Sequence, residues 1–225
     1  MNSPNEPTHI PDSAATVRNR PWIGRPVGSR STLKQDRAVR TREAILADAA
    51  RQFDTGGYGS TSVSMILAAN GIAKGALYYH FPSKEAIAQQ LSEDWNLAVE
   101  EAISDASAGV ADGTAFGRLT AIFTSLAHQL AEGTTLRAGM KLTLETAVDN
   151  GAAFARWVDA ISDIVETAIG AGEYVDGPVA HRLAWNLCSG TVGAVQAAAT
   201  LREDVDVVTR VQDVVSAHLK SVAAP

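Results

Sequence analysis

The stretch that most constrains the fold is residues 61–84, which read TSVSMILAANGIAKGALYYHFPSK. Apolar side chains in its first half follow the i, i+3, i+4 spacing of an amphipathic helix: Val63, Ile66 and Leu67. We therefore predict a short helix over residues 62–69, with the hydroxyl of Thr61 as its N-cap. Gly71 accepts a positive φ at little steric cost and ends this helix.

A second short helix is predicted over residues 74–79, because Pro82 disfavours helical geometry at the residue before it. Leu77 and Phe81 would anchor this helix from below. Two short helices across a glycine turn form a helix-turn-helix, whose second helix fits the major groove of DNA. Charge, close backbone approach and hydrogen-bond donors are supplied on its outer side by Lys74, Gly75, Tyr78, Tyr79 and His80. Spacing alone also allows an ordinary helical hairpin.

The run GIAKGALYYHFPSKEAI resembles the signature of TetR-family transcriptional repressors, and the resemblance covers about residues 40–87. It implies an all-α protein with a helix-turn-helix head and a helical body for ligand binding and dimerisation. Ala73 departs from the family pattern, in which Ser or Thr often caps the recognition helix. Lys84 lies in the first turn of the following helix, where it could bind phosphate. We expect DNA contacts from Arg40, Thr41, Thr61, Ser62, Lys74, Gly75, Tyr78, Tyr79, His80 and Lys84.

The distribution of charge supports a DNA-binding head. The net charge is −6, but residues 1–84 hold 11 Lys/Arg and 6 Asp/Glu, whereas residues 85–225 hold 8 and 19. A basic N-terminal third attracts phosphate and an acidic remainder repels it, which favours one docking orientation.

Three domains are expected: a basic, largely disordered extension over residues 1–33, a DNA-binding domain over 34–83 and a ligand-binding and dimerisation domain over 84–225. The extension is either a solvated tail or an arm that follows phosphates or enters the minor groove. No strand-like alternation occurs in the body, so helices are predicted throughout. Outside the helix-turn-helix they cover residues 36–55, 83–108, 115–131, 136–148, 154–169, 179–199 and 205–222.

Other chemistry is not indicated by the sequence. Cys188 is the single cysteine, which excludes an intrachain disulfide and favours a reducing compartment and a buried thiol over a redox sensor.

No apolar run reaches the roughly 18 residues of a membrane span, so we expect a soluble, cytoplasmic protein without a membrane partner. Phosphate-binding loops, dinucleotide fingerprints and nucleophile elbows are missing, and we expect no metal, no cofactor and no enzymatic activity. The histidines also lack metal-ligand spacing: His9, His80, His128, His181 and His218.

Three runs are similar to one TetR subgroup, the γ-butyrolactone-type autoregulator receptors of actinomycetes: RAVRTREAIL, KGALYYHFPSKEAIA and LRAGMKLTLE. The resemblance implies a body Trp that roofs the ligand cavity and a Thr on the penultimate helix that hydrogen-bonds the lactone. Trp157 and Thr191 match those roles by position, and Trp95 and Trp185 are weaker candidates. The alternatives are core packing for Trp157 and a bond to its own helix backbone for Thr191.

The sequence therefore predicts a homodimeric repressor that binds a palindromic double-stranded DNA operator through its head. A small, mostly apolar signalling molecule of the γ-butyrolactone, butenolide or furan type would release it from genes for antibiotics or secondary metabolites. Three alternatives remain: a TetR-type repressor that senses another hydrophobic compound such as a drug, a ligand-independent DNA-binding protein, and an enzyme. A ligand-independent protein would have a filled body core, and an enzyme would need polar groups that cluster in the interior.

Overall fold

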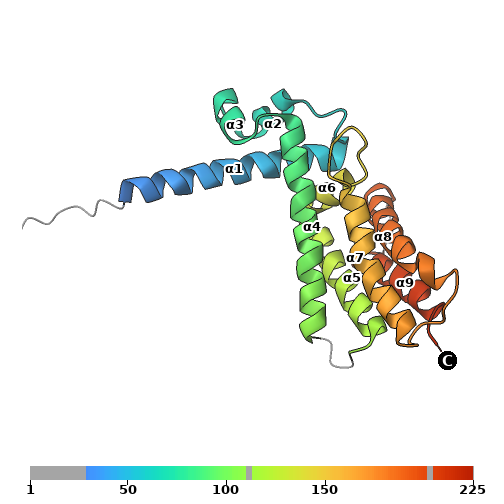
Figure 1. Cartoon of the computed structure of the whole chain (residues 1–225). Coiled ribbons are helices and arrows are strands. Elements are labelled where there is room, and N and C mark those ends of the chain that lie inside the picture. Colours follow the sequence, from blue (N-terminus) through green and yellow to red (C-terminus); the bar gives the residue numbers. More distant parts are fainter. Residues whose placement is uncertain (1–28, 110–112, 202–204, 225) are drawn as a thin grey trace, which may run out of the picture. The chain divides into compact units, whose positions relative to one another are not determined.

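The computed structural model describes residues 29–109, 113–201 and 205–224, and its regular elements are helices (Figure 1). The helices are α1 (Ser29–Gly56), α2 (Val63–Asn70), α3 (Lys74–His80), α4 (Lys84–Gly109), α5 (Ala115–Glu132), α6 (Thr134–Leu142), α7 (Ala153–Gly170), η1 (Ala180–Arg182), α8 (Leu183–Thr200) and α9 (Val207–Lys220). An isolated β-bridge pairs Tyr174 with Ala223. The all-α class is therefore confirmed for the described part of the chain. Most of the expected extension lies outside the described residues.

Three helix boundaries differ from the prediction by more than two residues. Helix α1 begins at Ser29, so the last residues assigned to the extension are already helical. Helix α6 ends at Leu142 instead of continuing to residue 148. The amide of Asn150 donates to the backbone oxygens of Leu142 and Thr143, and the N–H of Glu145 also donates to Leu142, so the carbonyls at this helix end are satisfied outside the helix. A turn of 3₁₀-helix precedes α8, where a continuous α-helix was predicted.

Two hydrophobic cores lie within residues 38–225, which form one compact unit; residues 1–37 form a second unit. The head core combines α1, α2, α3 and the start of α4. It also contains Ala138 and Leu142 of α6, together with Val148. The body core combines the rest of α4 with α5, α7, α8 and α9. Helix α6 thus packs into the head core, although the sequence placed it in the body, and a domain boundary at residue 83 stays a prediction.

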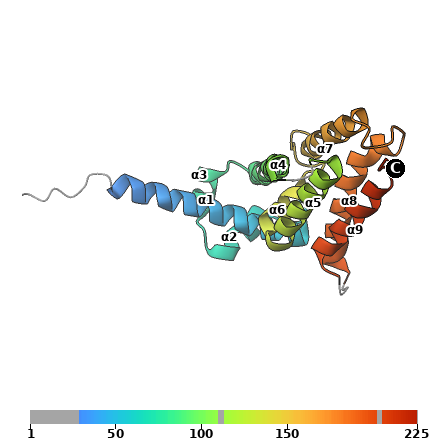
Figure 2. The ribbon, with the colours of Figure 1, turned by 90° about the horizontal axis from the view of Figure 1, so that it is seen from below.

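Helix α4 belongs to both cores, because Leu91 lies in the head core and Trp95, one turn later, lies in the body core. It packs against α5, α6 and α7, while α9 packs against α5 and α8 (Figures 1 and 2). Contacts in either core therefore act on the same helix.

Gly139 sets how closely α6 approaches α4. A Cβ atom at this position would lie 2.2 Å from the backbone oxygen of Leu91 and 3.2 Å from the Cβ atom of Trp95. Real structures do not tolerate the first of these distances, so any larger residue must push the two helices apart. The glycine is thus required at the point where the two cores meet on α4.

We expect Gly139→Ala to destabilise the fold, because backbone rather than a flexible side chain occupies the space that the methyl group needs. Overpacking of this kind costs about 1–3 kcal/mol, which lowers the melting temperature by roughly 2–12 °C in a chain of this size. Thermal unfolding followed by circular dichroism measures the change. Gly170→Ala is the matched control, because nothing lies within 4 Å of its added Cβ. Equal melting temperatures for the two variants would contradict the tight contact.

Candidate nucleic-acid interface and ligand site

The helix-turn-helix forms as predicted, with one change at its start. The N-cap of α2 is Ser62, whose Oγ accepts a hydrogen bond of 3.2 Å from the backbone N–H of Met65. The prediction of Thr61 as the cap is wrong: this side chain is buried and its hydroxyl donates to the backbone oxygen of Gly57. Thr61 therefore holds the preceding loop and presents no hydroxyl to DNA. Gly71 ends α2 in the left-handed conformation, with φ 62° and ψ 26°.

Helix α3 is anchored from beneath and exposed above. Leu77 and Phe81 are 0% and 3% exposed, which confirms them as its anchors. Tyr78 and Tyr79 are 45% and 80% exposed, values that are high for large aromatic side chains. The backbone N–H groups at the start of α3 receive no side-chain cap from Ala73. The helix thus offers polar groups outward while its apolar face is fixed.

The remaining polar residues of α3 lie on its accessible side. Lys74 and Gly75 are exposed, and His80 is half-buried with its ring edge-on to Tyr79. The ammonium of Lys74 lies 5.9 Å from the ring centroid of Tyr78. This position holds a cation beside a hydroxyl donor on the same helix, a combination suited to phosphate and base edges.

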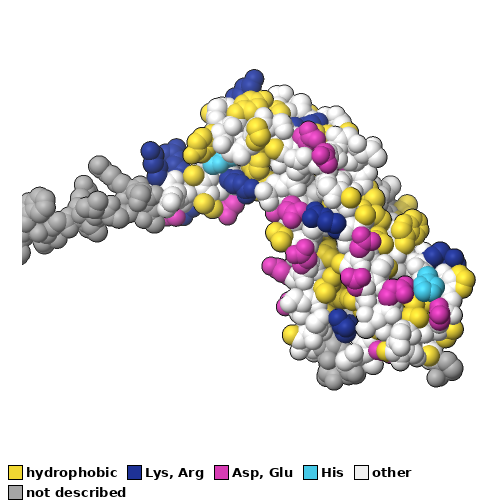
Figure 3. All heavy atoms as spheres, viewed as in Figure 1, with side chains coloured by type: hydrophobic (Ala, Val, Ile, Leu, Met, Phe, Trp, Pro, Cys, Tyr) yellow, Lys and Arg dark blue, Asp and Glu magenta, His cyan; other side chains and the backbone are white. Residues whose placement is uncertain are grey.

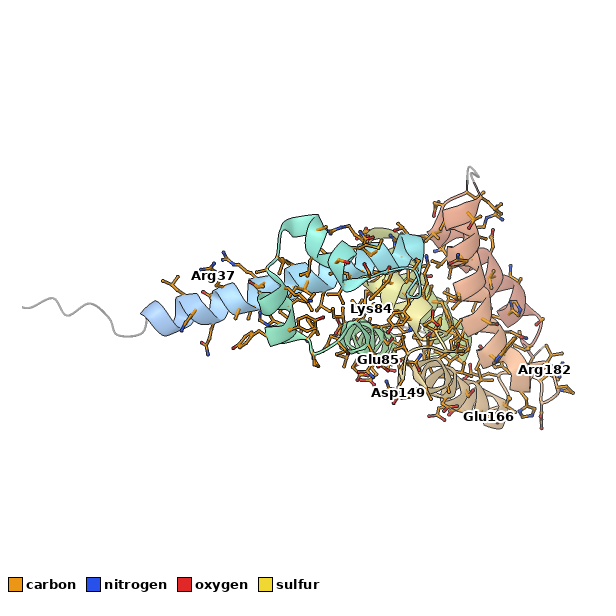
Figure 4. All side chains as sticks on the ribbon, turned by 90° about the horizontal axis from the view of Figure 1, so that it is seen from above. Arg37, Lys84, Glu85, Asp149, Glu166 and Arg182 are labelled. Carbon is orange, nitrogen blue, oxygen red and sulfur yellow. The ribbon has the colours of Figure 1, made fainter. Side chains whose placement is uncertain are left out.

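The structure assigns Lys84 a different role from the expected phosphate contact. Its Nζ donates to the backbone oxygens of Tyr58 and Thr61 at 2.8 and 2.9 Å. The same atom lies 3.9 Å from the ring centroid of Tyr58. Figure 4 shows Lys84 beside Glu85 at the start of α4. The ammonium therefore fixes the loop before α2 to α4. In this way it positions the helix-turn-helix from the side opposite its exposed surface.

Tyr58 completes this junction. Its ring packs against Phe53 with centroids 5.5 Å apart. Burial, followed by the negative charges of Glu85 and Glu145, raises the pKa of Tyr58, so it stays neutral at physiological pH. The carboxylate of Glu85 accepts a hydrogen bond of 3.2 Å from the backbone N–H of Asp149, and Figure 4 shows these two residues close together.

The DNA-contact candidates on α1 differ in accessibility. Arg40 is exposed and Thr41 is half-buried. The neighbouring Arg42 donates to Oε1 of Gln90 at 2.6 Å and stacks over the ring of Phe81 at 5.0 Å. Arg42 is thereby held against α4 and the end of α3, so Arg40 is the more accessible cation of the two.

Trp157 and Trp95, two of the proposed ligand residues, meet in the body core. Their rings are edge-to-face with centroids 5.0 Å apart, and Trp157 also contacts Phe123 at 6.2 Å and Phe154 at 5.8 Å. Both indoles are buried, and among the described residues neither indole N–H has a hydrogen-bond partner. Leaving such a donor unpaired costs about 1–3 kcal/mol. The tryptophans thus fill the core and at the same time keep two donors unused.

The other two proposed ligand residues are placed differently. Thr191 is fully buried, and its hydroxyl donates to the backbone oxygen of Leu187 at 2.8 Å. It can accept a further hydrogen bond but has no proton left to donate. Trp185 is 58% exposed on α8 and lies outside the body core. Trp185 thus lies on the surface of the protomer, and its role as a weaker ligand-site candidate stays a prediction.

Sequence reasoning missed two polar residues of α4, Ser92 and Asn96. They are 1% and 5% exposed, and the Oγ and Nδ2 atoms lack partners within the described chain. Their spacing in the sequence could have identified them. They lie one turn apart and flank Trp95, on a helix whose apolar stripe the sequence already shows.

Two hollows in the described surface are formed by other residues. One of about 430 Å³ lies where the end of α1 and the loop after it meet α6 and α8. Another of about 310 Å³ lies on the outer side of α8 and α9. Neither hollow is lined by Trp157 or Thr191, and both of these side chains are buried. A ligand that reaches them must therefore enter a closed core.

The described residues bear on metal binding, membrane insertion and thiol reactivity. They contain no cluster of three metal-ligating side chains, and none of their helices is long and apolar enough to cross a membrane. Burial raises the pKa of the Cys188 thiol, which makes it unreactive. Tyr174, at the end of the body core, has its pKa raised to about 12 by burial and by Glu173, so its hydroxyl stays protonated.

Comparison with known proteins decides the family. Residues 45–91 match the family described as bacterial regulatory proteins, tetR family. Over 85% of its length the chain is 30% identical to the full-length TetR regulator TylP of Streptomyces fradiae, covering 83% of that chain with a TM-score of 0.61. The chain belongs to the TetR family. Its relatives are transcriptional regulators and not enzymes, in agreement with the sequence prediction.

Two further TetR relatives match the subgroup that the sequence indicated. The A-factor receptor protein of Streptomyces griseus is 35% identical over 142 residues, which are 62% of this chain and 48% of that receptor. The chain thus aligns with about half the length of this curated relative. The chain is also 28% identical to a γ-butyrolactone receptor of known crystal structure, described as ArpA-like. The match covers 83% of this chain and 99% of that chain, with a TM-score of 0.64.

We expect Lys84→Met to destabilise this TetR head, because it leaves the two carbonyls that the ammonium satisfies without that donor. The loss should be about 1–3 kcal/mol, measured by urea unfolding. Lys74→Met is the matched control: its ammonium is exposed and bonds no backbone carbonyl among the described residues, so stability should stay within about 0.5 kcal/mol. If Lys84→Met leaves the stability unchanged, the structural role of Lys84 is refuted, and the phosphate contact expected from the sequence becomes the better explanation.

Proposed function

We propose that this TetR-family protein is a ligand-responsive transcriptional repressor that binds a palindromic operator as a dimer. A small, mostly apolar signalling molecule of the γ-butyrolactone, butenolide or furan type releases it, and its targets are genes for antibiotics or secondary metabolites. The observation that carries this proposal is α3, which exposes Lys74, Tyr78 and Tyr79 above a buried anchor. The similarity to the A-factor receptor supports the ligand class.

The charges favour docking through the head. Figure 3 shows acidic side chains gathered on the face that α4 and α7 form below it. The exposed acidic residues of these helices are Glu93, Glu100, Glu101, Asp105, Asp159, Asp163 and Glu166. Their negative potential repels phosphate, so the body stays away from DNA while α3 enters the major groove.

The outer side of α8 and α9 is the surface that we assign to dimerisation. The hollow of about 310 Å³ there is lined mostly by small and apolar residues, among them Gly193, Ala197 and Val214. Leu201 beside it is 53% exposed. Exposed apolar side chains around a shallow hollow suit a self-complementary contact, and two heads match two half-sites of a palindrome.

A ligand-independent repressor is the competing function, and one observation favours it: the body core is closed around Trp95 and Trp157. The unpaired indole donors favour a ligand instead. A core that serves only stability pairs its buried polar groups or replaces them with apolar ones. We therefore retain the ligand-responsive function.

The function is tested by selecting binding sites from a random pool of double-stranded DNA and titrating the complex with acyl-γ-butyrolactones in a gel-shift assay. We expect a palindromic site and its release by the lactone. Failure to select any DNA would exclude the repressor function. Stable binding that no lactone, butenolide, furan or hydrophobic drug reverses would establish the ligand-independent alternative.

We expect Lys74→Ala to weaken binding to the selected DNA, because it removes an exposed cation from α3. The logarithmic salt dependence of the binding constant should fall by about one for each phosphate that the variant no longer neutralises. Lys220→Ala, which removes an exposed cation at the end of α9, is the control and should leave both affinity and slope unchanged. Fluorescence anisotropy at several salt concentrations measures both. An unchanged slope for Lys74→Ala would remove Lys74 from the interface.

We expect Ala197→Arg to produce a folded monomer, because the charge falls on the outer side of α8. Charges at Val195 or Val211 do not test the interface: these residues are 1% and 0% exposed inside the protomer, so such variants would unfold. Sedimentation at micromolar concentration measures the association. Ala155→Arg, an exposed position on α7, is the control that stays dimeric. A monomeric wild-type protein, or a dimeric Ala197→Arg variant, would refute this interface.

A further inference from the structure

Arg42 of α1 joins three helices of the head through two contacts. Its Nη2 donates to Oε1 of Gln90 on α4 at 2.6 Å. Its guanidinium lies over the ring of Phe81, with Cζ 5.0 Å from the ring centroid. Phe81 is the residue at which α3 ends, and its N–H donates to the backbone oxygen of Leu77. One side chain therefore holds the end of α3 between α1 and α4.

Gln90 connects this contact to a negative charge on α4. Its Nε2 donates to Oδ1 of Asp94, one turn further along the helix, at 2.8 Å. An amide carries an acceptor and donors on one group, so Gln90 accepts from the guanidinium and donates to the carboxylate at the same time. Glutamate would turn a second negative charge toward Asp94, and leucine would make neither hydrogen bond. The amide thus suits both of its neighbours at once.

The contacts around Arg42 are partly sheltered from solvent. Phe81 is 3% exposed, and Arg42, Gln90 and Asp94 are each half-buried. Hydrogen bonds to charged groups are stronger than neutral ones, and partly buried charges are screened less by salt than exposed ones. A guanidinium within about 6 Å of an aromatic centroid adds a cation–π attraction. Polar contacts therefore fix the end of α3 to α4, in addition to the packing of the head core.

The position of Phe81 matters because α3 is short. The helix has seven residues, and no side-chain cap holds its first turn. Its anchors are Leu77 in the middle and Phe81 at the end, both buried. Two anchors along one helix define its direction, and this direction decides which base edges the exposed side chains reach.

We propose that Arg42, Gln90 and Asp94 form a relay that fixes the end of α3 to α4 and thereby sets the angle at which α3 enters the major groove. This inference rests on the proposed function, because it names the residues that position its recognition helix. Arg42 and Gln90 are positioning residues: they act on DNA through α3 and do not touch it. A displacement of α4 reaches α3 directly through this relay.

The first test uses Gln90→Leu, which leaves the charge of the head unchanged. We expect its affinity for the selected operator to fall roughly three- to tenfold, because a tilted α3 loses base contacts. Its affinity for a random duplex of the same length should stay within about twofold, because the phosphate contacts remain. Fluorescence anisotropy measures both affinities. Gln89→Leu is the matched control: Gln89 is exposed and donates to the backbone oxygen of Asp149, so both affinities should stay unchanged.

Arg42→Lys separates geometry from charge. Lysine keeps the positive charge but lacks the planar group that lies over Phe81 while it donates to Gln90. We expect the same loss of operator affinity as for Gln90→Leu, with an unchanged salt dependence on the random duplex. In the double variant the two losses should not add, because each substitution breaks the same relay.

A measurement without DNA tests the contact itself. Hydrogen exchange followed by NMR reports how often the hydrogen bond from the Phe81 N–H to Leu77 opens. In Gln90→Leu and Arg42→Lys we expect exchange at Phe81 to be roughly three- to tenfold faster than in the wild type. Exchange at Gly57, whose N–H donates to the backbone oxygen of Phe53 at the end of α1, should not change. This comparison separates local loosening of α3 from a general loss of stability.

The outcomes separate this inference from the function beneath it. Wild-type operator affinity in both variants, or unchanged exchange at Phe81, would overturn the inference. An equal fall in both affinities, with a salt slope lowered by about one, would make Arg42 a phosphate ligand and overturn it as well. In each of these cases operator binding by the wild type still supports the repressor function. If the wild type selects no DNA, that function fails, and exchange at Phe81 still decides whether the relay holds α3.

Discussion

The contact between α6 and α4 at Gly139 is the constraint on which the two cores depend. Gly139 lies against the backbone of Leu91, in the head core, and against Trp95, in the body core. At this glycine the two helices approach so closely that one cannot shift without displacing the other. A displacement of the α4 backbone at Leu91 or Trp95 therefore acts directly on α6.

Ion pairs connect α6 in turn to α1. The carboxylate of Asp54, 9% exposed at the end of α1, lies between Arg137 and Lys141 of α6 at 2.9 and 2.7 Å. Lys141 also donates to the backbone oxygen of Asp54, and Arg137 to that of Leu130. The end of α1 leads into the loop that Lys84 fastens to α4. A continuous series of packing contacts, ion pairs and hydrogen bonds thus connects Trp95 in the body core to the loop before α2 in the helix-turn-helix.

This arrangement suggests how ligand binding in the body releases the protein from DNA. A ligand shifts the equilibrium between two head positions only by its differential affinity for them, and a shift from 1:99 to 99:1 takes about 5.5 kcal/mol. In the proposed mechanism, a ligand acceptor that pairs with the unpaired indole N–H groups of Trp95 and Trp157 supplies part of that difference. In the same proposed mechanism, opening the closed core around Trp95 and Trp157 displaces α6 through its contact with α4 at Gly139. Because α4 belongs to both cores, it connects the proposed ligand-binding body to the DNA-binding head.

Local sequence patterns predicted much of this molecule. The spacing of apolar residues gave the helices, Gly71 the turn, and Leu77 and Phe81 the anchor of α3, because each depends on neighbours within one or two helical turns. Thr61 and Ser62 are adjacent hydroxyl residues, and propensity alone does not tell which of them caps α2. The roles of Lys84 and Asp54 depend on partners 23 to 87 residues away, so no local pattern contains them. The same holds for α6, whose place in the head core follows from packing.

The distance between the two DNA-binding heads of the proposed dimer tests the central claim most directly. Cys188 is buried, so Ala69→Cys provides one accessible thiol per protomer for a spin label on α2. Pulsed electron–electron double resonance then measures the label-to-label distance with selected DNA bound and with α-octanoyl-γ-butyrolactone bound. Our account predicts two distinct distances, and a smaller difference when Asp54→Asn weakens the connection between α1 and α6. The same distance in both states, with the lactone shown to be bound, would contradict it.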